Sequence, residues 1–212
     1  GVMNFDNGLA VDAGSLAATV TGNATLRGVA CSAAITCDDT FGNDVNIGGI
    51  AGSVSGAVTV EHTINTQAKA LISTCKILQG NTRIGGAVGY VGDVAVTVNA
   101  SGITVSRSIM AGESATSKKI AQIGGFIGCI AQGEQGNVEK KINVKAVNIT
   151  GLSFDSFEMN VGQNGDKRKG AGGLLGYSWG GANVTIGDTV KDNSDGTYAL
   201  KTKNATINAD NA

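Results

Sequence analysis

The sequence predicts an all-β protein built as a parallel β-solenoid, because it combines a recurring glycine cluster, strict alternation after each cluster and few large side chains. The cluster has the form Gly-Gly-x-x-Gly, with two apolar residues between the glycines, and occurs at residues 48–52, 85–89, 124–128 and 172–176. Successive copies start 37, 39 and 48 residues apart. A pattern that returns at such a period is typical of stacked repeats.

The composition favours thin, repetitive β layers. The 212 residues include 33 glycines and no proline, and 42% are apolar although only 4% are aromatic. Small and β-branched residues must therefore fill the core. With 16% charged residues and a net charge of −1, the composition argues against disorder and gives no general attraction to nucleic acid. No apolar run reaches the roughly 18 residues that a membrane span needs.

Each glycine cluster is followed by a run in which apolar and polar residues alternate. The apolar members are Val58, Val60 and Ile64, then Val94, Val96 and Val98, then Ile142 and Val144, then Ala182, Val184 and Ile186. A period of two predicts strands with one buried and one wet face. Residues 16–20 and 23–29 are also expected to form short strands. No convincing long amphipathic helix occurs, which argues against alternating β and α layers.

The predicted organisation is an irregular N-terminal cap, or a degenerate first coil, at residues 1–46, followed by solenoid repeats over 47–212. The repeats cover 47–83, 84–122, 123–170 and 171–212, with a loop insertion at 152–169. Terminal repeats are usually atypical, which suits the irregular first segment. Because glycine permits both φ > 0 and close backbone approach, we expect each cluster to form a sharp corner.

The four clusters resemble the GLUG motif, a Gly-Gly-Leu-[Val/Ile]-Gly sequence followed by a polar or aromatic residue and short strands. The matching segments are 47–52, 84–90, 123–128 and 171–177. The motif occurs in bacterial surface adhesins and in secreted proteins of the IgA-peptidase type, which resemble right-handed parallel β-helices. The resemblance therefore implies a right-handed β-helix in a secreted or surface adhesin. It carries no catalytic residues.

Aromatic residues after the clusters are candidates for binding. If the repeats stack, the residues after each final glycine form a column of Ser53, Tyr90, Cys129 and Tyr177. Tyr90, Tyr177 and the nearby Trp179 would then be placed to stack on sugars, or simply to cover a corner of the fold. Polysaccharide-cleaving enzymes on β-helices gather carboxylates and basic residues on one face, and the candidates here are Asp93, Asp155, Glu158, Asp166 and Arg168.

Two further features lie near residue 40. Asp38, Asp39 and Asp44 form an acidic loop that would suit calcium, although Asp and Asn also favour ordinary turns. Cys31 and Cys37 are close enough in sequence for a local disulfide in an oxidising compartment.

The other two cysteines, Cys75 and Cys129, lie in apolar surroundings and are expected to be buried. No cysteine–histidine spacing resembles a zinc site.

Other motifs carry less information. Residues 176–180 match the Gly-x-Ser-x-Gly nucleophile elbow, but no histidine follows, and the match arises from the fourth glycine cluster. His62 shares its parity with Val60 and is expected to be a partly buried strand residue. Five sequons, at Asn23, Asn99, Asn148, Asn183 and Asn204, would carry glycans in a eukaryotic secreted protein.

These observations lead to an extracellular or cell-surface repeat protein with a structural or adhesive role and no catalysis, either an adhesin segment or a filament subunit. The expected partners are a second copy of the chain, or another surface protein or glycan, because an open solenoid end is an unpaired sheet edge. No nucleic acid, membrane span or cofactor other than calcium is expected. The alternative is a β-helix that binds or cleaves carbohydrate.

Overall fold

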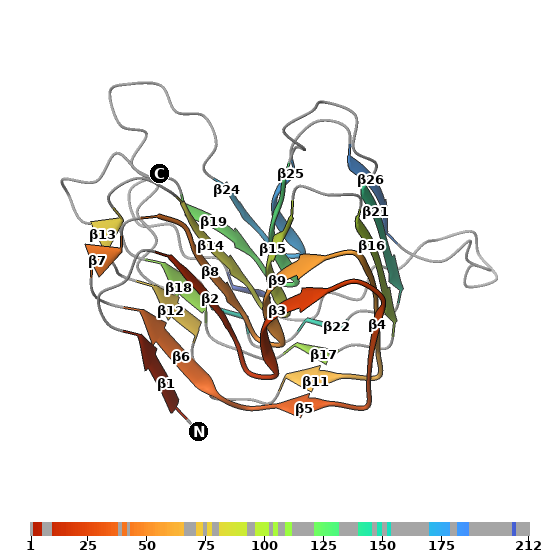
Figure 1. Ribbon diagram of the computed structural model, residues 1–212, viewed down its shortest axis with the longest axis horizontal. Helices are drawn as coiled ribbons and strands as arrows, with labels where there is room; N and C mark the ends of the chain where they lie inside the picture. The colour runs from red at the N-terminus through yellow and green to blue at the C-terminus, as the bar shows by residue number, and fades with distance from the viewer. Residues whose placement is uncertain are drawn as a thin grey trace.

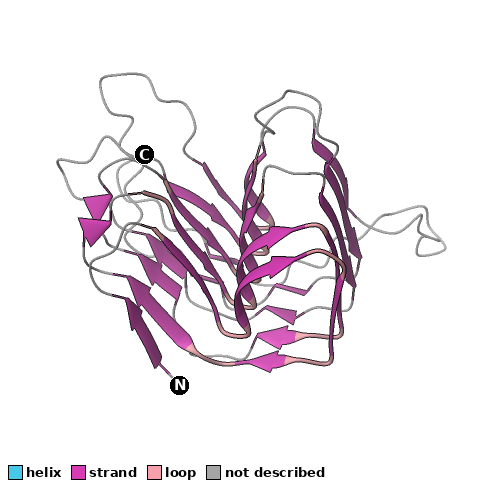
Figure 2. Ribbon diagram, in the orientation of Figure 1, coloured by secondary structure: helices cyan, strands magenta, loops and turns pink. Residues whose placement is uncertain are grey.

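The protein is all-β, and every strand pairing among the residues that the structure describes is parallel (Figure 2). The computed structural model describes residues 2–5, 10–37, 40–41, 43–65, 71–73, 76–77, 81–92, 96–101, 104–105, 109–111, 121–131, 140–145, 148–149, 152–153, 170–178, 182–186 and 205–206. None of them is helical. In particular, this part of the chain holds no helix with the length and apolarity needed to cross a bilayer.

Two five-stranded sheets flank the glycine clusters (Figure 1). Sheet 1 precedes the clusters and contains β2 (Val11–Gly14), β8 (Val45–Gly48), β14 (Thr82–Gly85), β19 (Ala121–Gly124) and β24 (Gly170–Gly172). Sheet 2 follows them and contains β3 (Ala17–Thr21), β9 (Ala51–Ser55), β15 (Val88–Val91), β20 (Ile127–Ile130) and β25 (Leu175–Ser178).

Most of the residues predicted to alternate lie in a third five-stranded sheet, and Val94 lies outside the described residues. Sheet 3 contains β4 (Ala24–Arg27), β10 (Ala57–Glu61), β16 (Val96–Ser101), β21 (Lys140–Lys145) and β26 (Ala182–Ile186). Its apolar positions are in register, so that Val58 lies beside Val98, and Val98 beside Ile142.

Shorter strands complete each repeat. Sheet 4 contains β5 (Ala30–Cys31), β11 (Ile64–Asn65), β17 (Thr104–Val105) and β22 (Asn148–Ile149). Sheet 5 contains β1 (Val2–Phe5), β6 (Ala34–Cys37), β12 (Leu71–Ser73) and β18 (Ile109–Ala111). Two small pairs join β7 (Thr40–Phe41) to β13 (Lys76–Ile77) and β23 (Leu152–Ser153) to β27 (Ala205–Thr206).

The chain visits sheets 1 to 5 in the same order in repeats 1, 2 and 3, which begin at β2, β8 and β14. Repeat 4, which begins at β19, visits sheets 1 to 4 in that order. Repeat 5 begins at β24 and returns to sheets 1, 2 and 3 in turn. The first glycines of the clusters are paired in register, Gly48 with Gly85, Gly85 with Gly124 and Gly124 with Gly172. Gly14 extends this row, 34 residues before Gly48.

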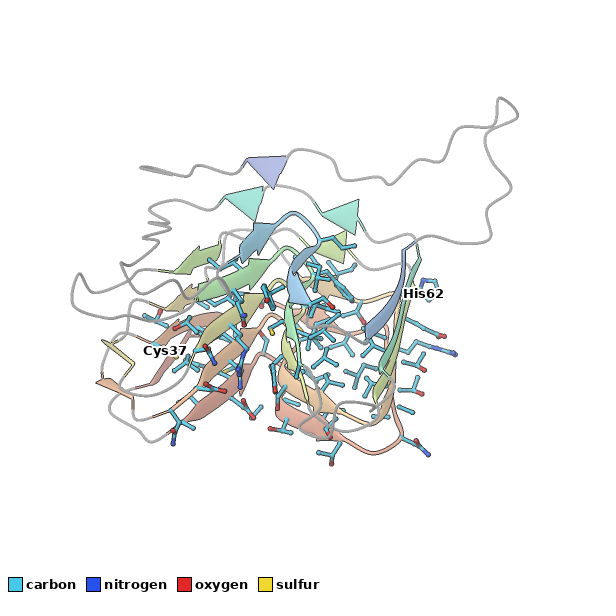
Figure 3. The ribbon with its side chains drawn as sticks, turned by 90° about the horizontal axis from the view of Figure 1, so that it is seen from above. Cys37 and His62 are labelled. Atoms are coloured by element: carbon cyan, nitrogen blue, oxygen red, sulfur yellow. The ribbon has the colours of Figure 1, made fainter. Side chains whose placement is uncertain are left out.

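The core lies between the sheets and is made mainly of Val, Ile and Ala (Figure 3). One buried cluster combines residues of all five sheets, for example Ala13, Val54, Val58, Cys31 and Ile35. Phe126 is the largest fully buried side chain among the residues that the structure describes. The scarcity of aromatic residues is thus matched by a core of small and β-branched side chains.

Two expectations at the end of β10 are wrong. His62 is exposed and has a φ of 49°, so it forms a turn between β10 and β11 rather than continuing the strand. The turn ends the alternation, and Ile64 therefore lies in sheet 4 with 50% of its surface exposed, although Val58 and Val60 are buried. In repeat 1 the matching turn position is Gly28, whose φ is 63°.

Candidate functional site

Polar side chains from several repeats meet in a seam between sheets 1 and 2. One column of the seam comes from sheet 1, and register pairing gives its members as Asp12, Asn46, Arg83, Gln122 and Gly170. The other comes from sheet 2 and consists of Thr19, Ser53, Tyr90, Cys129 and Tyr177. In each repeat the two members are seven residues apart in the chain. The sequence-predicted column of Ser53, Tyr90, Cys129 and Tyr177 is therefore confirmed and gains Thr19.

The first glycine of each cluster makes the corner that joins the two columns. A Cβ atom at Gly85 or Gly124 would overlap the carbonyl oxygen of the residue three positions later, Val88 or Ile127. The same overlap occurs at Gly14, Gly48 and Gly172. None of these glycines has a left-handed φ, so the expectation of a positive φ at the corner is wrong. Glycine is required here because the backbone approaches itself closely within the corner.

The last glycine of each cluster brings sheet 2 against the backbone of sheet 1 in the preceding repeat. A Cβ at Gly89 would lie 2.7 Å from the nitrogen of Ile47, and one at Gly128 would lie 2.8 Å from that of Ile84. At Gly176 the corresponding distance, to Ile123, is 2.6 Å. Because backbone atoms cannot rotate away as a side chain can, these positions exclude any larger residue.

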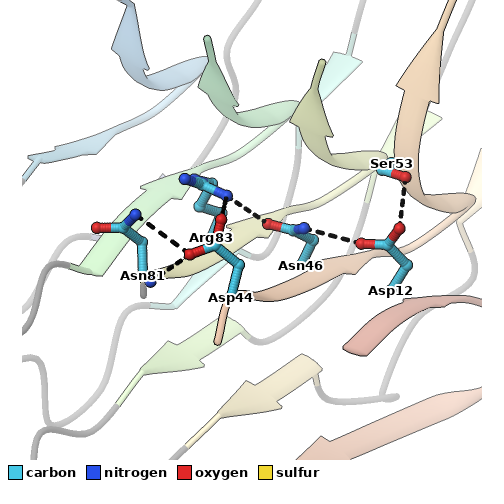
Figure 4. Close-up of polar contacts among 6 residues, drawn as sticks. All are labelled: Asp12, Asp44, Asn46, Ser53, Asn81 and Arg83. Atoms are coloured by element: carbon cyan, nitrogen blue, oxygen red, sulfur yellow. Dashed lines mark hydrogen bonds and ion pairs between the residues drawn. The ribbon is translucent and has the colours of Figure 1, made fainter. Parts of the chain in front are cut away.

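Asp12 organises the N-terminal end of the seam (Figure 4). Its Oδ2 accepts hydrogen bonds from Thr19 Oγ1 at 2.9 Å and from Ser53 Oγ at 2.7 Å. Its Oδ1 accepts a hydrogen bond from Asn46 Nδ2 at 2.8 Å. One carboxylate thus joins both columns and links repeat 1 to repeat 2.

Arg83 holds the middle of the seam. Its Nη1 forms an ion pair with Asp44 Oδ2 at 2.5 Å and donates to Asn46 Oδ1 at 3.1 Å (Figure 4). Its guanidinium carbon lies 4.1 Å from the centre of the Tyr90 ring, which is a cation–π contact. Asp44 also accepts a hydrogen bond from the backbone nitrogen of Asn81 at 2.7 Å. These contacts connect repeats 2 and 3.

The middle of the seam is removed from solvent, whereas Asp12, Tyr90 and Tyr177 are half-buried and Thr19 is exposed. Arg83 and Asn46 are each 7% exposed, Ser53 is 8% exposed and Gln122 is 2% exposed. Buried polar groups are costly unless they have hydrogen-bond partners, and Asn46, Ser53 and the Nη1 atom of Arg83 have such partners in neighbouring repeats. The arrangement therefore fixes the register of one repeat on the next.

The two tyrosines predicted to bind sugars, Tyr90 and Tyr177, lie in one column, but their rings are not fully exposed for stacking on a sugar. Tyr90 and Tyr177 are both half-buried and are separated by Cys129, which places them about 10 Å apart at two strand spacings. Arg83 covers one face of Tyr90. Trp179 lies outside the described residues, as do Asp93, Asp155, Glu158, Asp166 and Arg168.

Of the three residues predicted to bind calcium, the structure describes Asp44. The Asp44 carboxylate is engaged by Arg83 and Asn81. Asp38 and Asp39 lie outside the described residues. Calcium binding at this loop stays a prediction.

The predicted disulfide between Cys31 and Cys37 is not formed. Both residues are buried thiols, Cys31 in sheet 4 and Cys37 in sheet 5, and each packs in the core cluster. Cys129 is likewise buried, as expected, and Cys75 lies outside the described residues. The change of strand direction between β5 and β6 puts the two cysteines in different walls of the core.

The sequons are distributed over several elements. Asn23 is exposed in the turn before β4, Asn99 and Asn183 belong to strands of sheet 3, and Asn148 begins β22. Asn204 lies outside the described residues. Glycosylation at these positions stays a prediction.

Sequence reasoning missed the sheet 1 column of the seam. Its members share no chemistry, since they include an acid, two amides, a base and a glycine. Their common signal is position, because each lies two residues before the first glycine of a corner. No protein-family model, curated protein or solved structure matches this chain.

Proposed function

We propose that the chain is a right-handed parallel β-solenoid that serves a structural or adhesive role in an extracellular or cell-surface protein. The observation that carries the proposal is the continuous parallel register of sheets 1, 2 and 3 through five repeats. Such stacking turns a chain into a rod or platform whose stability comes from neighbouring repeats.

The seam supports a structural role for its polar residues. Asp12, Asn46 and Arg83 are engaged with side chains of adjacent repeats, rather than being displayed together on an open surface. The resemblance of the glycine clusters to the GLUG motif supports a surface adhesin.

The first test is the oligomeric state of the purified chain, measured by light scattering and by negative-stain images. Filaments or end-to-end assemblies would support a filament subunit. A monomer would support an adhesive module that binds another surface protein or a glycan. A compact particle whose X-ray scattering does not fit a stacked rod would contradict the solenoid.

Carbohydrate binding is the second candidate, favoured by the column that contains Tyr90 and Tyr177. A glycan array with the intact chain would test it. Binding that is lost in Tyr177→Ala, and retained in a variant of the exposed Thr21, would support this candidate. An array without any bound glycan would count against it.

A further inference from the structure

We infer that Ala18 closes the N-terminal end of the stack, so that no further glycine-cluster repeat can pair in register with repeat 1 at the corner of sheets 1 and 2. The inference rests on the proposed solenoid and concerns the partner that its ends accept. It makes the two ends of the stack unequal.

The last glycine of each cluster in repeats 2 to 5 lies against the backbone of the repeat before it. At Gly52, Gly89, Gly128 and Gly176, an added Cβ would collide with sheet 1 backbone of the preceding repeat, at Ala13, Ile47, Ile84 and Ile123 respectively. The colliding residue is in each case the one before the first glycine of that preceding repeat. Four repeats therefore obey one rule: a repeat that stacks on an earlier one needs glycine here.

Repeat 1 breaks this rule. Register pairing places Ala17 beside Ala51 and Thr19 beside Ser53, so Ala18 occupies the position of Gly52. Ala18 is exposed, and β3 is the terminal strand of sheet 2 among the described strands. Its methyl group fills the space that the sheet 1 strand of an earlier repeat would need.

The opposite end keeps the matching surface. β24, β25 and β26 are terminal strands of their sheets within the described part of the chain. If a second copy placed its repeat 1 on this end in register, its Ala18 would face the backbone at Ala171, the residue before Gly172. A coil with glycine at the position of Ala18 fits this surface, whereas the chain's own first repeat does not.

The first experiment compares the wild-type chain with Ala18→Gly by light scattering over a range of concentrations and by negative-stain images. We expect a wild-type chain that does not join end to end, and a variant that forms concentration-dependent end-to-end assemblies. Ala30→Gly is the matched control, because Ala30 is also exposed on a terminal strand, β5, away from the corner. Equal assembly states of wild type and Ala18→Gly would overturn the inference, as would assembly of the control.

A second experiment separates this inference from the proposed fold. A copy of residues 45–81 is inserted between Ala10 and Val11, with and without Ala18→Gly, and thermal unfolding is followed by circular dichroism. We expect Ala18→Gly to raise the Tm of the insertion protein and to leave unchanged or lower that of the parent. A folded insertion protein whose Tm does not respond to Ala18→Gly would overturn the inference about Ala18 and leave the proposed solenoid intact. If the insertion protein fails to fold both with and without Ala18→Gly, the proposed solenoid is overturned, and the inference about Ala18 with it.

Discussion

Arg83 joins three kinds of contact in one side chain, and its removal should be costly. Arg83→Ala breaks the ion pair with Asp44, the hydrogen bond to Asn46 and the contact with Tyr90. Because the Asp44 side chain is 36% exposed and can regain water, we expect a loss of about 2 kcal/mol in the free energy of unfolding, below the usual cost of breaking a buried pair. Urea denaturation measures it.

Arg27→Ala is the matched control for that prediction. Arg27 also pairs with a carboxylate of the next repeat, Glu61, at 2.6 Å, but its side chain is 68% exposed. Exposed ion pairs contribute roughly 0–1 kcal/mol, so the control should lose far less stability. Equal losses for the two arginines would show that burial in the seam is not what makes Arg83 important.

His62 presents the opposite case, a residue whose backbone conformation costs stability. Its φ of 49° is unfavourable for a residue with a Cβ, and Gly28 occupies the matching turn. His62→Gly should therefore raise the free energy of unfolding by up to about 1 kcal/mol. His62→Ala keeps the Cβ and should bring no such gain in the same denaturation experiment, so a gain from alanine would refute the backbone explanation.

At the scale of elements, the corner between sheets 1 and 2 depends on close backbone approach. Gly128→Ala places a methyl group 2.8 Å from the backbone of Ile84, and we expect a loss of about 3 kcal/mol or more. Gly173→Ala is the control within a cluster, because its Cβ would meet nothing within 4 Å, and its stability should change by less than about 1 kcal/mol. Thermal unfolding of both variants tests the contrast.

Elements could be predicted from the sequence where the same residue types recur in each repeat. They could not be predicted where equivalent positions carry different residue types, as in the sheet 1 column of the seam. The glycine clusters and the alternation over Val58 and Val60 led to sheets 1 to 3, and the residues after each cluster led to Ser53 and Tyr90. For repeat 1 the sequence predicts only a cap or a degenerate coil, because its cluster is reduced to a single glycine at Gly14. The break at His62 has no strong sequence signal, since turns at positive φ usually carry Gly, Asn or Asp.

At the scale of the whole molecule, one corner column shows how stacking buries apolar surface. Backbone hydrogen bonds join Leu16, Ile50, Ala87, Phe126 and Leu174 in order, each nitrogen donating to the next carbonyl. Phe126 is fully buried in the middle, whereas Leu16 at the end is 45% exposed. The all-β, parallel character of the fold could be predicted because these columns repeat, but burial along a column follows from its length and its ends, which no local pattern encodes.

Phe126→Ala should therefore be much more damaging than Leu16→Ala. Removing the buried ring leaves a cavity within the stack, and we expect a loss of about 3–5 kcal/mol. Leu16 is partly solvated already, so its truncation should cost less than about 1.5 kcal/mol. Guanidinium denaturation of both variants would measure the difference, and similar losses would mean that the column is not stacked as described.

The last glycine of each cluster also gives the stack an order of construction. Each sheet 2 strand of repeats 2 to 5 rests on a sheet 1 strand that belongs to the repeat before it. The surface that receives a new repeat is thus complete before that repeat arrives, provided that the chain emerges with its N-terminus first. Growth from the first repeat can proceed one layer at a time on a finished template, whereas growth from the last repeat would have to leave that supporting layer for later.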